Sequence, residues 1–366
     1  MKSFTALLSY ASLLALASHV SAVPTPANQA LDLRQTTGVD SSSNKNTVNP
    51  AIPIYPRKAS GDAPYSVDEN TLRSAIYIPS TFQYGKTGKQ PVLLVPGTTL
   101  PGGTSYSNAF GKLLAASSYA DPVWLNIPGY SLGDVQVNSE YVAYAMNYLS
   151  GVSQQKNISV ISWSQGGINT QWGFKYWPST RSVVSDFVAL APDFRGTIEA
   201  DLLCSGLTFA LCTPSIKQQR DKSNLIATLR NNGGDSAYVP TTTFYSATDQ
   251  IVQPQIGTGA SSFMLDARNV GVTNNQIQEV CRGTIQIILH EAVLYNAVAW
   301  ALIEDALNHD GPGSRSRLDL PKLCFALAAP GLNVIQGQSI LATAIPNILA
   351  YKTHVFNEPA IAAYAK

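Results

Sequence analysis

The residues best suited to chemistry are Ser162-Trp163-Ser164-Gln165-Gly166-Gly167, where small residues flank a central serine. An apolar, β-branched run, Ile158–Ile161, precedes this segment, and a helix-like stretch from Ile168 to Tyr176 follows it. A strand, a tight turn and a helix in this order hold a serine in a strained conformation that exposes its hydroxyl group at the end of a sheet. Ser164 is therefore the candidate nucleophile.

This pattern is typical of the nucleophile elbow of an α/β-hydrolase, with one departure. The usual motif is G-x-S-x-G, and Ser162 stands in place of the first glycine. Serine is small enough for the close approach of strand and helix, although it lacks the freedom of glycine at positive φ. The assignment therefore depends on whether the chain also supplies a base and an acid.

Of the four histidines, His290 has the sequence context that suits a general base. It follows the apolar run Ile285–Leu289, which predicts a strand, so the loop at its end can bring the imidazole to the serine. His19 lies in the apolar N-terminal segment, His309 in a polar turn and His354 in the tail. The second histidine of an H-E-x-x-H zinc motif is missing after His290, and no metal site is predicted.

The acid that orients the base is assigned to Asp249. It comes just after the predicted strand Thr241–Tyr245, whereas Asp193 follows the earlier strand Phe187–Ala191. In an α/β-hydrolase the chain order is Ser, then Asp or Glu, then His, and the acid belongs after a later strand. A buried carboxylate at Asp249 would fix the imidazole tautomer and stabilise the imidazolium.

The negative charge that develops on an attacked carbonyl oxygen needs two backbone N–H donors. Gln165, the residue after the nucleophile, supplies the first. Thr98, in the loop after the apolar strand Val92–Val95, is the candidate for the second. Its hydroxyl group is a candidate third donor.

Strands and helical stretches alternate from Pro91 onward, which predicts an α/β-hydrolase fold with a mostly parallel central sheet and helices on both faces. Further predicted elements are strands at Pro122–Ile127 and Ile158–Ile161 and a helix at Asn138–Leu149. The tail from Leu323 to Tyr351 is a helical region rich in Ala, Ile and Leu, interrupted by Pro330-Gly331 and Pro346. It serves either as ordinary core or as an apolar wall around a substrate mouth.

Composition excludes several other classes of protein. The chain has 366 residues, 45% hydrophobic and 13% charged, with a formal net charge of +1. A net charge this close to zero gives no positively charged surface of the kind that binds nucleic acid. Gly257-Thr258-Gly259 lacks the third glycine of a dinucleotide motif, and the sequence has no P-loop. We therefore expect neither a cofactor nor a nucleic-acid partner.

The N-terminal part of the chain predicts export from the cell. Residues 1–22 have a positive start, a short apolar segment and a small-residue end, typical of a signal peptide cut after Ala22. Residues 23–50 predict a disordered leader or propeptide, with Arg34 as a candidate cleavage point, and 51–366 the catalytic domain. No later stretch is apolar enough to span a bilayer.

An even number of cysteines in an exported chain favours two disulfides. The four cysteines, Cys204, Cys212, Cys281 and Cys324, allow three pairings. Asn157-Ile158-Ser159 is a glycosylation sequon at the start of a predicted strand, and its occupancy is left open.

Several short segments together resemble the Candida antarctica lipase B family of secreted fungal α/β-hydrolases. They lie between Pro91 and Phe356 and comprise Leu94–Thr98, Trp163–Gly167, Gln171–Gly173, Ala191–Asp193, Tyr245–Asp249, Ile251–Gln255 and His290. The resemblance implies Ser164 as nucleophile, Asp249 as acid, His290 as base, and Thr98 and Gln165 as oxyanion donors. It also implies Trp163 on the alcohol side of the substrate pocket, Asp193 and Gln219 on the acyl side, and a Cys281–Cys324 disulfide. That pairing leaves Cys204 and Cys212, only eight residues apart, as a local pair.

The chain departs from the family in three ways. Thr99 and Leu100 stand where the family has Gly and Thr, so the rim of the oxyanion loop is bulkier and less polar. The family's N-terminal disulfide and its disulfide-bonded C-terminal extension are missing. Cys204 and Cys212 have no counterpart and fall where a short mobile helix covers the family's active site, so the loop between them is expected over the substrate mouth.

Together the sequence predicts a secreted, monomeric serine carboxylester hydrolase of the triacylglycerol lipase type, acting on a lipid or small ester through an acyl-enzyme. The alternative is an esterase or acyltransferase for smaller or specialised esters. A binding protein with a hydrolase fold but without turnover is disfavoured, because the Ser, Asp and His set is complete.

Overall fold

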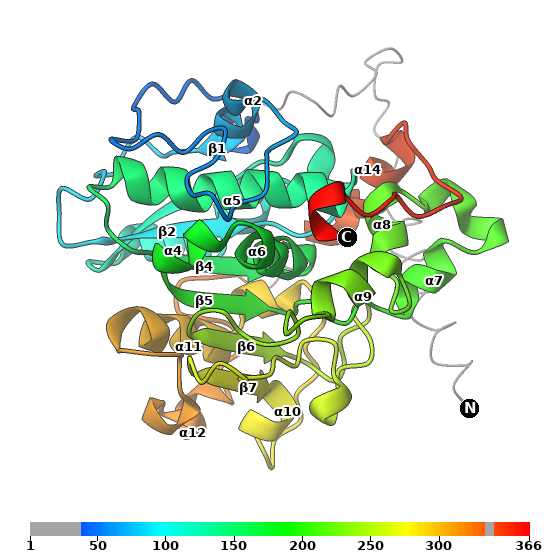
Figure 1. Ribbon diagram of the computed structural model, residues 1–366. Coiled ribbons are helices and arrows are strands. Elements are labelled where there is room, and N and C mark those ends of the chain that lie inside the picture. Colours follow the sequence, from blue (N-terminus) through cyan, green and yellow to red (C-terminus); the bar gives the residue numbers. More distant parts are fainter. Residues whose placement is uncertain (1–37, 334–339) are drawn as a thin grey trace, which may run out of the picture.

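The computed structural model describes residues 38–333 and 340–366, which are built around a seven-stranded sheet (Figure 1). The strand order is β1-β3-β2-β4-β5-β6-β7; β1 is antiparallel to β3, and the other neighbours are parallel. The strands are β1 Ile76–Tyr77, β2 Gln90–Val95, β3 Ala120–Leu125, β4 Ile158–Trp163, β5 Val184–Leu190, β6 Thr241–Tyr245 and β7 Val272–Gln276. The predicted α/β-hydrolase fold with a mostly parallel sheet is confirmed.

Two apolar cores lie on opposite faces of this sheet. In β2, Leu93 and Val95 pack into one core, whereas Val92 and Leu94 pack into the other. The first core lies beneath α5 (Val135–Val152), α6 (Gln165–Tyr176) and α9 (Asn224–Arg230); the second lies beneath α3 (Gly102–Tyr106), α4 (Phe110–Ala116) and α11 (Ala297–Asn308). Strands that are buried on both faces are rich in apolar and β-branched residues, which is why the sequence predicted most of them.

Short helices cover the end of the sheet toward which the parallel strands point, on the right of Figure 1. They are α7 (Glu199–Leu203), the 3-10 helix η4 (Gly206–Leu211), α8 (Pro214–Gln218) and α14 (Ala344–Ala350). Other short elements include α2 (Glu69–Ser74), α10 (Ile277–Val280), α12 (Leu320–Leu323) and the 3-10 helix η8 (Ile340–Thr343). Among the residues that the structure describes, no helix is long and apolar enough to cross a membrane.

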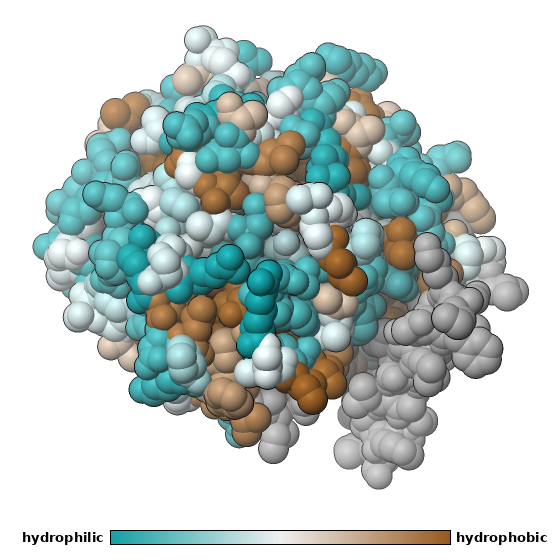
Figure 2. Space-filling view, turned by 90° about the horizontal axis from the view of Figure 1, so that it is seen from below, coloured by the Kyte–Doolittle hydropathy of each residue, from teal (hydrophilic) through white to brown (hydrophobic). Residues whose placement is uncertain are grey.

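The predicted strand Ile285–Leu289 is wrong. This segment is an irregular loop in which Ile285 and Ile287 are 90% and 69% exposed. Its backbone is bound by a side chain, because Thr248 Oγ1 lies within hydrogen-bonding distance of both Ile288 N (2.9 Å) and Ile288 O (3.1 Å). Figure 2, which views the molecule from the side of α10 and α12, shows hydrophobic residues exposed among hydrophilic ones on this face.

The last strand is instead β7, whose sequence VTNNQ gives no apolar signal. Its polar side chains bind the neighbouring strand: Thr243 Oγ1 donates to Asn274 Oδ1 (3.0 Å), and Asn275 Nδ2 donates to Thr243 O (3.0 Å). An edge strand can be stabilised in this way without a continuous apolar sequence.

Residues 38–50, on the N-terminal side of the predicted domain boundary at residue 51, belong to the described structure. Residues 38–50, expected in a disordered leader, contact the rest of the domain. Val39 O accepts hydrogen bonds from Trp124 Nε1 and Asn126 Nδ2, and the Asp40 carboxylate accepts two from Thr104. The predicted signal peptide and Arg34 lie outside the described residues.

In the described part of the predicted helical tail, 323–333 and 340–351, the helical pieces are the end of α12, η8 and α14. Pro346 does not interrupt it, because it is the third residue of α14, where a backbone N–H would have no partner within the helix.

Both predicted disulfides, Cys204–Cys212 and Cys281–Cys324, are confirmed. The first closes a short loop that contains η4. The second joins the ends of α10 and α12.

Replacing Cys281 and Cys324 together by serine should lower the free energy of unfolding by about 4 kcal/mol, because the bond spans 43 residues and restricts the unfolded chain. Urea unfolding followed by tryptophan fluorescence measures this loss. The Cys204→Ser/Cys212→Ser variant is the control: its 8-residue span predicts about 2.5 kcal/mol. A larger loss in the control would contradict the prediction.

Candidate active site

The strand, turn and helix predicted around Ser164 are confirmed. Ser164 joins β4 to α6 and has φ 55° and ψ −132°, a region that non-glycine residues rarely occupy. Two backbone hydrogen bonds hold it: its N–H donates to Leu190 O (3.0 Å), and its carbonyl accepts from Gly167 N (2.8 Å). The serine is thus fixed at the carboxyl end of the sheet.

Close packing explains the small residues around the serine. A Cβ atom on Gly97 would lie 2.8 Å from Ser164 Cβ, and one on Gly166 would lie 2.6 Å from Val95 O. Ser162 is the last but one residue of β4 and is fully buried with an extended backbone, so its position requires a small residue rather than glycine. The departure from G-x-S-x-G therefore does not disturb the elbow.

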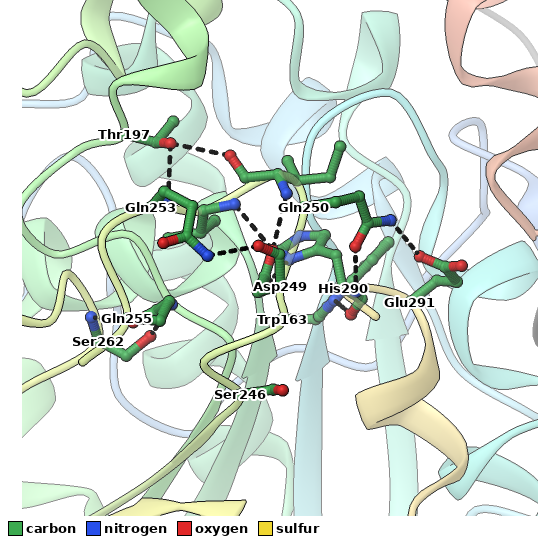
Figure 3. Close-up of polar contacts among 12 residues, drawn as sticks. Trp163, Thr197, Ser246, Asp249, Gln250, Gln253, Gln255, Ser262, His290 and Glu291 are labelled. Atoms are coloured by element: carbon green, nitrogen blue, oxygen red, sulfur yellow. Dashed lines mark hydrogen bonds and ion pairs between the residues drawn. The ribbon is translucent and has the colours of Figure 1, made fainter. Parts of the chain in front are cut away.

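Asp249 and His290, predicted as acid and base, lie in direct contact (Figure 3). His290 Nδ1 is 2.7 Å from Asp249 Oδ2, and both side chains are buried. The other carboxylate oxygen, Asp249 Oδ1, accepts hydrogen bonds of 2.8 Å from the backbone N–H groups of Ile251 and Val252. The carboxylate is therefore held in one orientation relative to the imidazole.

The backbone of His290 is positioned by side chains. His290 N donates to Gln250 Oε1 (2.8 Å), and Trp163 Nε1 donates to His290 O (3.1 Å). Gln250 is oriented in turn by donating to Glu291 Oε2 (3.0 Å; Figure 3). These hydrogen bonds position His290, a role that the sequence analysis had given to the predicted strand before it.

Two opposing effects act on the pKa of His290. Burial disfavours the charged imidazolium, but the negative charge of Asp249 and its hydrogen bond outweigh burial and raise the pKa of His290 above its ordinary value. The pair therefore favours proton uptake by this imidazole.

Ser164 and His290 both line a pocket of about 260 Å³. Thr98, Trp163 and Gln219 also line it. Most of its wall is apolar and comes from α7, η4, α8 and the tail: Ala200, Leu203, Leu211, Ile216, Leu341, Ala344, Ile345 and Ile348. The tail thus forms an apolar wall as well as core, and the disulfide-closed loop lies at the pocket as expected.

The loop proposed for the oxyanion donors is bound by side chains from two directions. Thr98 Oγ1 donates to Gln165 Oε1 (2.7 Å) and lies 3.2 Å from Gln219 Oε1. Thr99 has φ 77°, a strained value for a β-branched residue, and its carbonyl accepts from Asn347 Nδ2 (2.8 Å). The family's Gly would adopt this conformation without strain.

Asp193, expected on the acyl side, is not among the residues that line the pocket. It is completely buried, and its carboxylate oxygens have no hydrogen-bond partner among residues 38–333 and 340–366. Burial raises the pKa of Asp193 to about 7. Among the described residues, His290 therefore contacts the carboxylate of Asp249 and not that of Asp193.

The sequence did not indicate two further residues at the site, Gln250 and Glu199. Gln250 directly follows Asp249, and a polar side chain next to the predicted acid is the sequence feature that could have indicated it. Glu199 lines the pocket but belongs to no motif. In the part of the chain that the structure describes, no group of three or more His, Cys, Asp or Glu side chains is placed to hold a metal ion.

A serine elbow and a buried Asp–His pair at the carboxyl ends of a mostly parallel sheet define an α/β-hydrolase. No protein-family model matches the chain. The chain is 36% identical to lipase B of Pseudozyma antarctica over 269 residues. The aligned region covers 73% of this chain and 75% of that protein. The crystal structure of Aspergillus fumigatus lipase B matches the fold with a TM-score of 0.87 at 54% identity, covering 90% of this chain and 79% of that one. The chain belongs to the lipase B family and is a lipase B-like hydrolase.

Asp249→Asn should lower the pKa of His290, because it removes the negative charge that outweighs burial. A nitrogen-15 NMR titration of the imidazole measures the midpoint, which should exceed about 6.5 in the wild type. Glu291→Gln removes a negative charge that raises the pKa of His290 less than Asp249 does, and it should lower that pKa by a smaller amount. An unchanged midpoint in Asp249→Asn would contradict this account of the pair.

Proposed function

We propose that this protein is a secreted serine carboxylester hydrolase of the triacylglycerol lipase type. Ser164 is the nucleophile, His290 the general base and Asp249 the acid that orients it. One observation carries the proposal: the strained serine and the Asp249-bound imidazole line the same apolar pocket.

The reaction begins when Ser164 Oγ attacks the ester carbonyl carbon and His290 Nε2 takes the hydroxyl proton. Asp249 accepts a hydrogen bond from Nδ1–H and stabilises the imidazolium that forms. The carbonyl oxygen becomes negative and accepts hydrogen bonds from the backbone N–H groups of Thr98 and Gln165. The imidazolium then protonates the departing alkoxide, and water, activated by the same base, hydrolyses the acyl-enzyme.

The lining of the pocket supports a lipid-like substrate. Exposed apolar residues adjoin the lining residues in the chain: Ile198, Leu202 and Leu349. An acyl chain can leave water along such a surface and enter the pocket. We assign the alcohol side of the pocket to Trp163 and the acyl side to Gln219.

An esterase or acyltransferase for smaller esters is the second candidate. It is favoured by the modest pocket of about 260 Å³ and by the disulfide-closed loop at its wall. Hydrolysis of p-nitrophenyl esters of increasing acyl length, beside emulsified triacylglycerol, separates the two. The lipase proposal requires activity on the emulsion.

Ser164→Ala should lower kcat by about 10⁵–10⁶-fold, because the nucleophile is removed while binding remains. Ester hydrolysis measures the loss, and a fluorophosphonate should label the wild type at Ser164. Ser162→Ala, two residues away in β4, is the control and should retain labelling. Labelling at another residue, with activity retained in Ser164→Ala, would refute the assignment.

The Cys204→Ser/Cys212→Ser variant should change the ratio of the hydrolysis rate on emulsified ester to the rate on dissolved ester. The bond ties the ends of a loop whose Thr208 and Leu211 line the pocket, and so limits how far that loop can open. Rates below and above the solubility limit of one ester measure this ratio. An unchanged ratio would mean that the disulfide is structural and the loop is not a lid.

A further inference from the structure

Glu199 is a half-buried acidic residue that lines a mostly apolar pocket. It is the first residue of α7 and lines the pocket with Ala200 and Leu203 of the same helix. Its backbone N–H donates to Thr197 Oγ1 (3.2 Å). Its carboxylate forms no hydrogen bond or ion pair with any residue in the described ranges 38–333 and 340–366.

The chain around Glu199 is fixed between two parts of the site. Thr197 N donates to Gln219 O (2.7 Å), and Thr197 Oγ1 donates to Ile251 O (2.8 Å). Gln219 and Ile251 both line the pocket. Glu199 therefore lies beside the side that we assign to the acyl group and near the loop that carries Asp249.

This position is unfavourable for an unpaired charge. Burial, and then the negative charge of Asp249, raise the pKa of Glu199 above its ordinary value. A plain alkyl chain entering the pocket would remove further water from the carboxylate without offering it a donor, which costs free energy. A substrate that brings its own donor avoids that cost.

A hydroxyl group fits this requirement best. An O–H donor to a carboxylate makes a short, charge-assisted hydrogen bond, stronger than one between neutral groups. An ammonium group would offer the opposite charge, but its transfer from water into a pocket walled by Leu203, Ile216 and Ile345 costs far more than that of a hydroxyl.

We propose that Glu199 is a specificity-determining residue that selects esters whose acyl chain carries a hydroxyl group. This inference rests on the ester hydrolase activity proposed above and names the substrate class that the acyl side accepts. Glu199 acts on the choice of substrate and takes no part in the bond-making steps.

Competition between two esters tests the inference. Methyl octanoate competes with methyl hydroxyoctanoates that carry the hydroxyl at successive carbons, and the ratio of kcat/KM values is measured. The wild type should prefer one hydroxylated isomer by roughly tenfold or more, as expected for a hydrogen bond to a charged group. Glu199→Leu should lose this preference and hydrolyse plain octanoate faster, and Glu199→Gln should show an intermediate ratio.

Asp201→Asn is the matched control. It removes a carboxylate from the same helix, but this carboxylate pairs with Arg220 and does not line the pocket. It should keep the wild-type ratio. Thermal unfolding checks that the Glu199 variants are folded; should Glu199→Leu unfold, a ratio reduced several-fold in Glu199→Gln carries the test.

Equal ratios in the wild type and the Glu199 variants for every isomer would overturn the inference, as would a preference for an aminooctanoate ester over all hydroxylated ones. If the wild type hydrolyses plain octanoate through Ser164, such a result refutes the selectivity alone. A wild type that hydrolyses no ester refutes the proposed function and this inference with it.

Discussion

The site depends on the close contact between the β4–α6 turn and the loop after β2. The backbones approach so closely that a side chain on Gly97 or Gly166 would collide with Ser164 or Val95. This contact leaves the serine in its strained conformation and brings the start of α6 beside Thr98. One packing constraint therefore positions both the proposed nucleophile and the proposed oxyanion donors, and the cores on both faces of the sheet supply the stability that offsets the strain.

The base is positioned by a different physical means. His290 lies at the end of an irregular loop, where hydrogen bonds with Gln250, Trp163 and Asp249 fix its backbone and ring. Side-chain hydrogen bonds can replace a strand in this role because each buried donor and acceptor is costly to leave unpaired. The same cost applies to Glu199, whose carboxylate has no partner among the described residues although it lines the pocket.

Sequence reasoning succeeded where a buried strand is made largely of apolar, β-branched or aromatic residues, as in β2, β4, β5 and β6. It failed for β7, which is stabilised by Thr and Asn side chains, and for Ile285–Leu289, whose apolar residues are exposed. The Asp249–His290 pair could be predicted because the fold fixes the chain order of the site. Gln250, Glu199 and the buried position of Asp193 could not, because they depend on contacts between distant segments. The Cys281–Cys324 pairing was implied by family resemblance, which left Cys204 and Cys212 as the second pair; the number of cysteines alone allowed three pairings.

The most direct test of this account is a crystal structure of the protein inhibited by an alkyl phosphonate. We predict a bond between phosphorus and Ser164 Oγ, with the phosphoryl oxygen about 2.7–3.1 Å from the backbone nitrogens of Thr98 and Gln165. His290 Nε2 should lie within hydrogen-bonding distance of Oγ or of the ester oxygen. A phosphoryl oxygen that points away from both backbone nitrogens, or an adduct on another residue, would contradict the account.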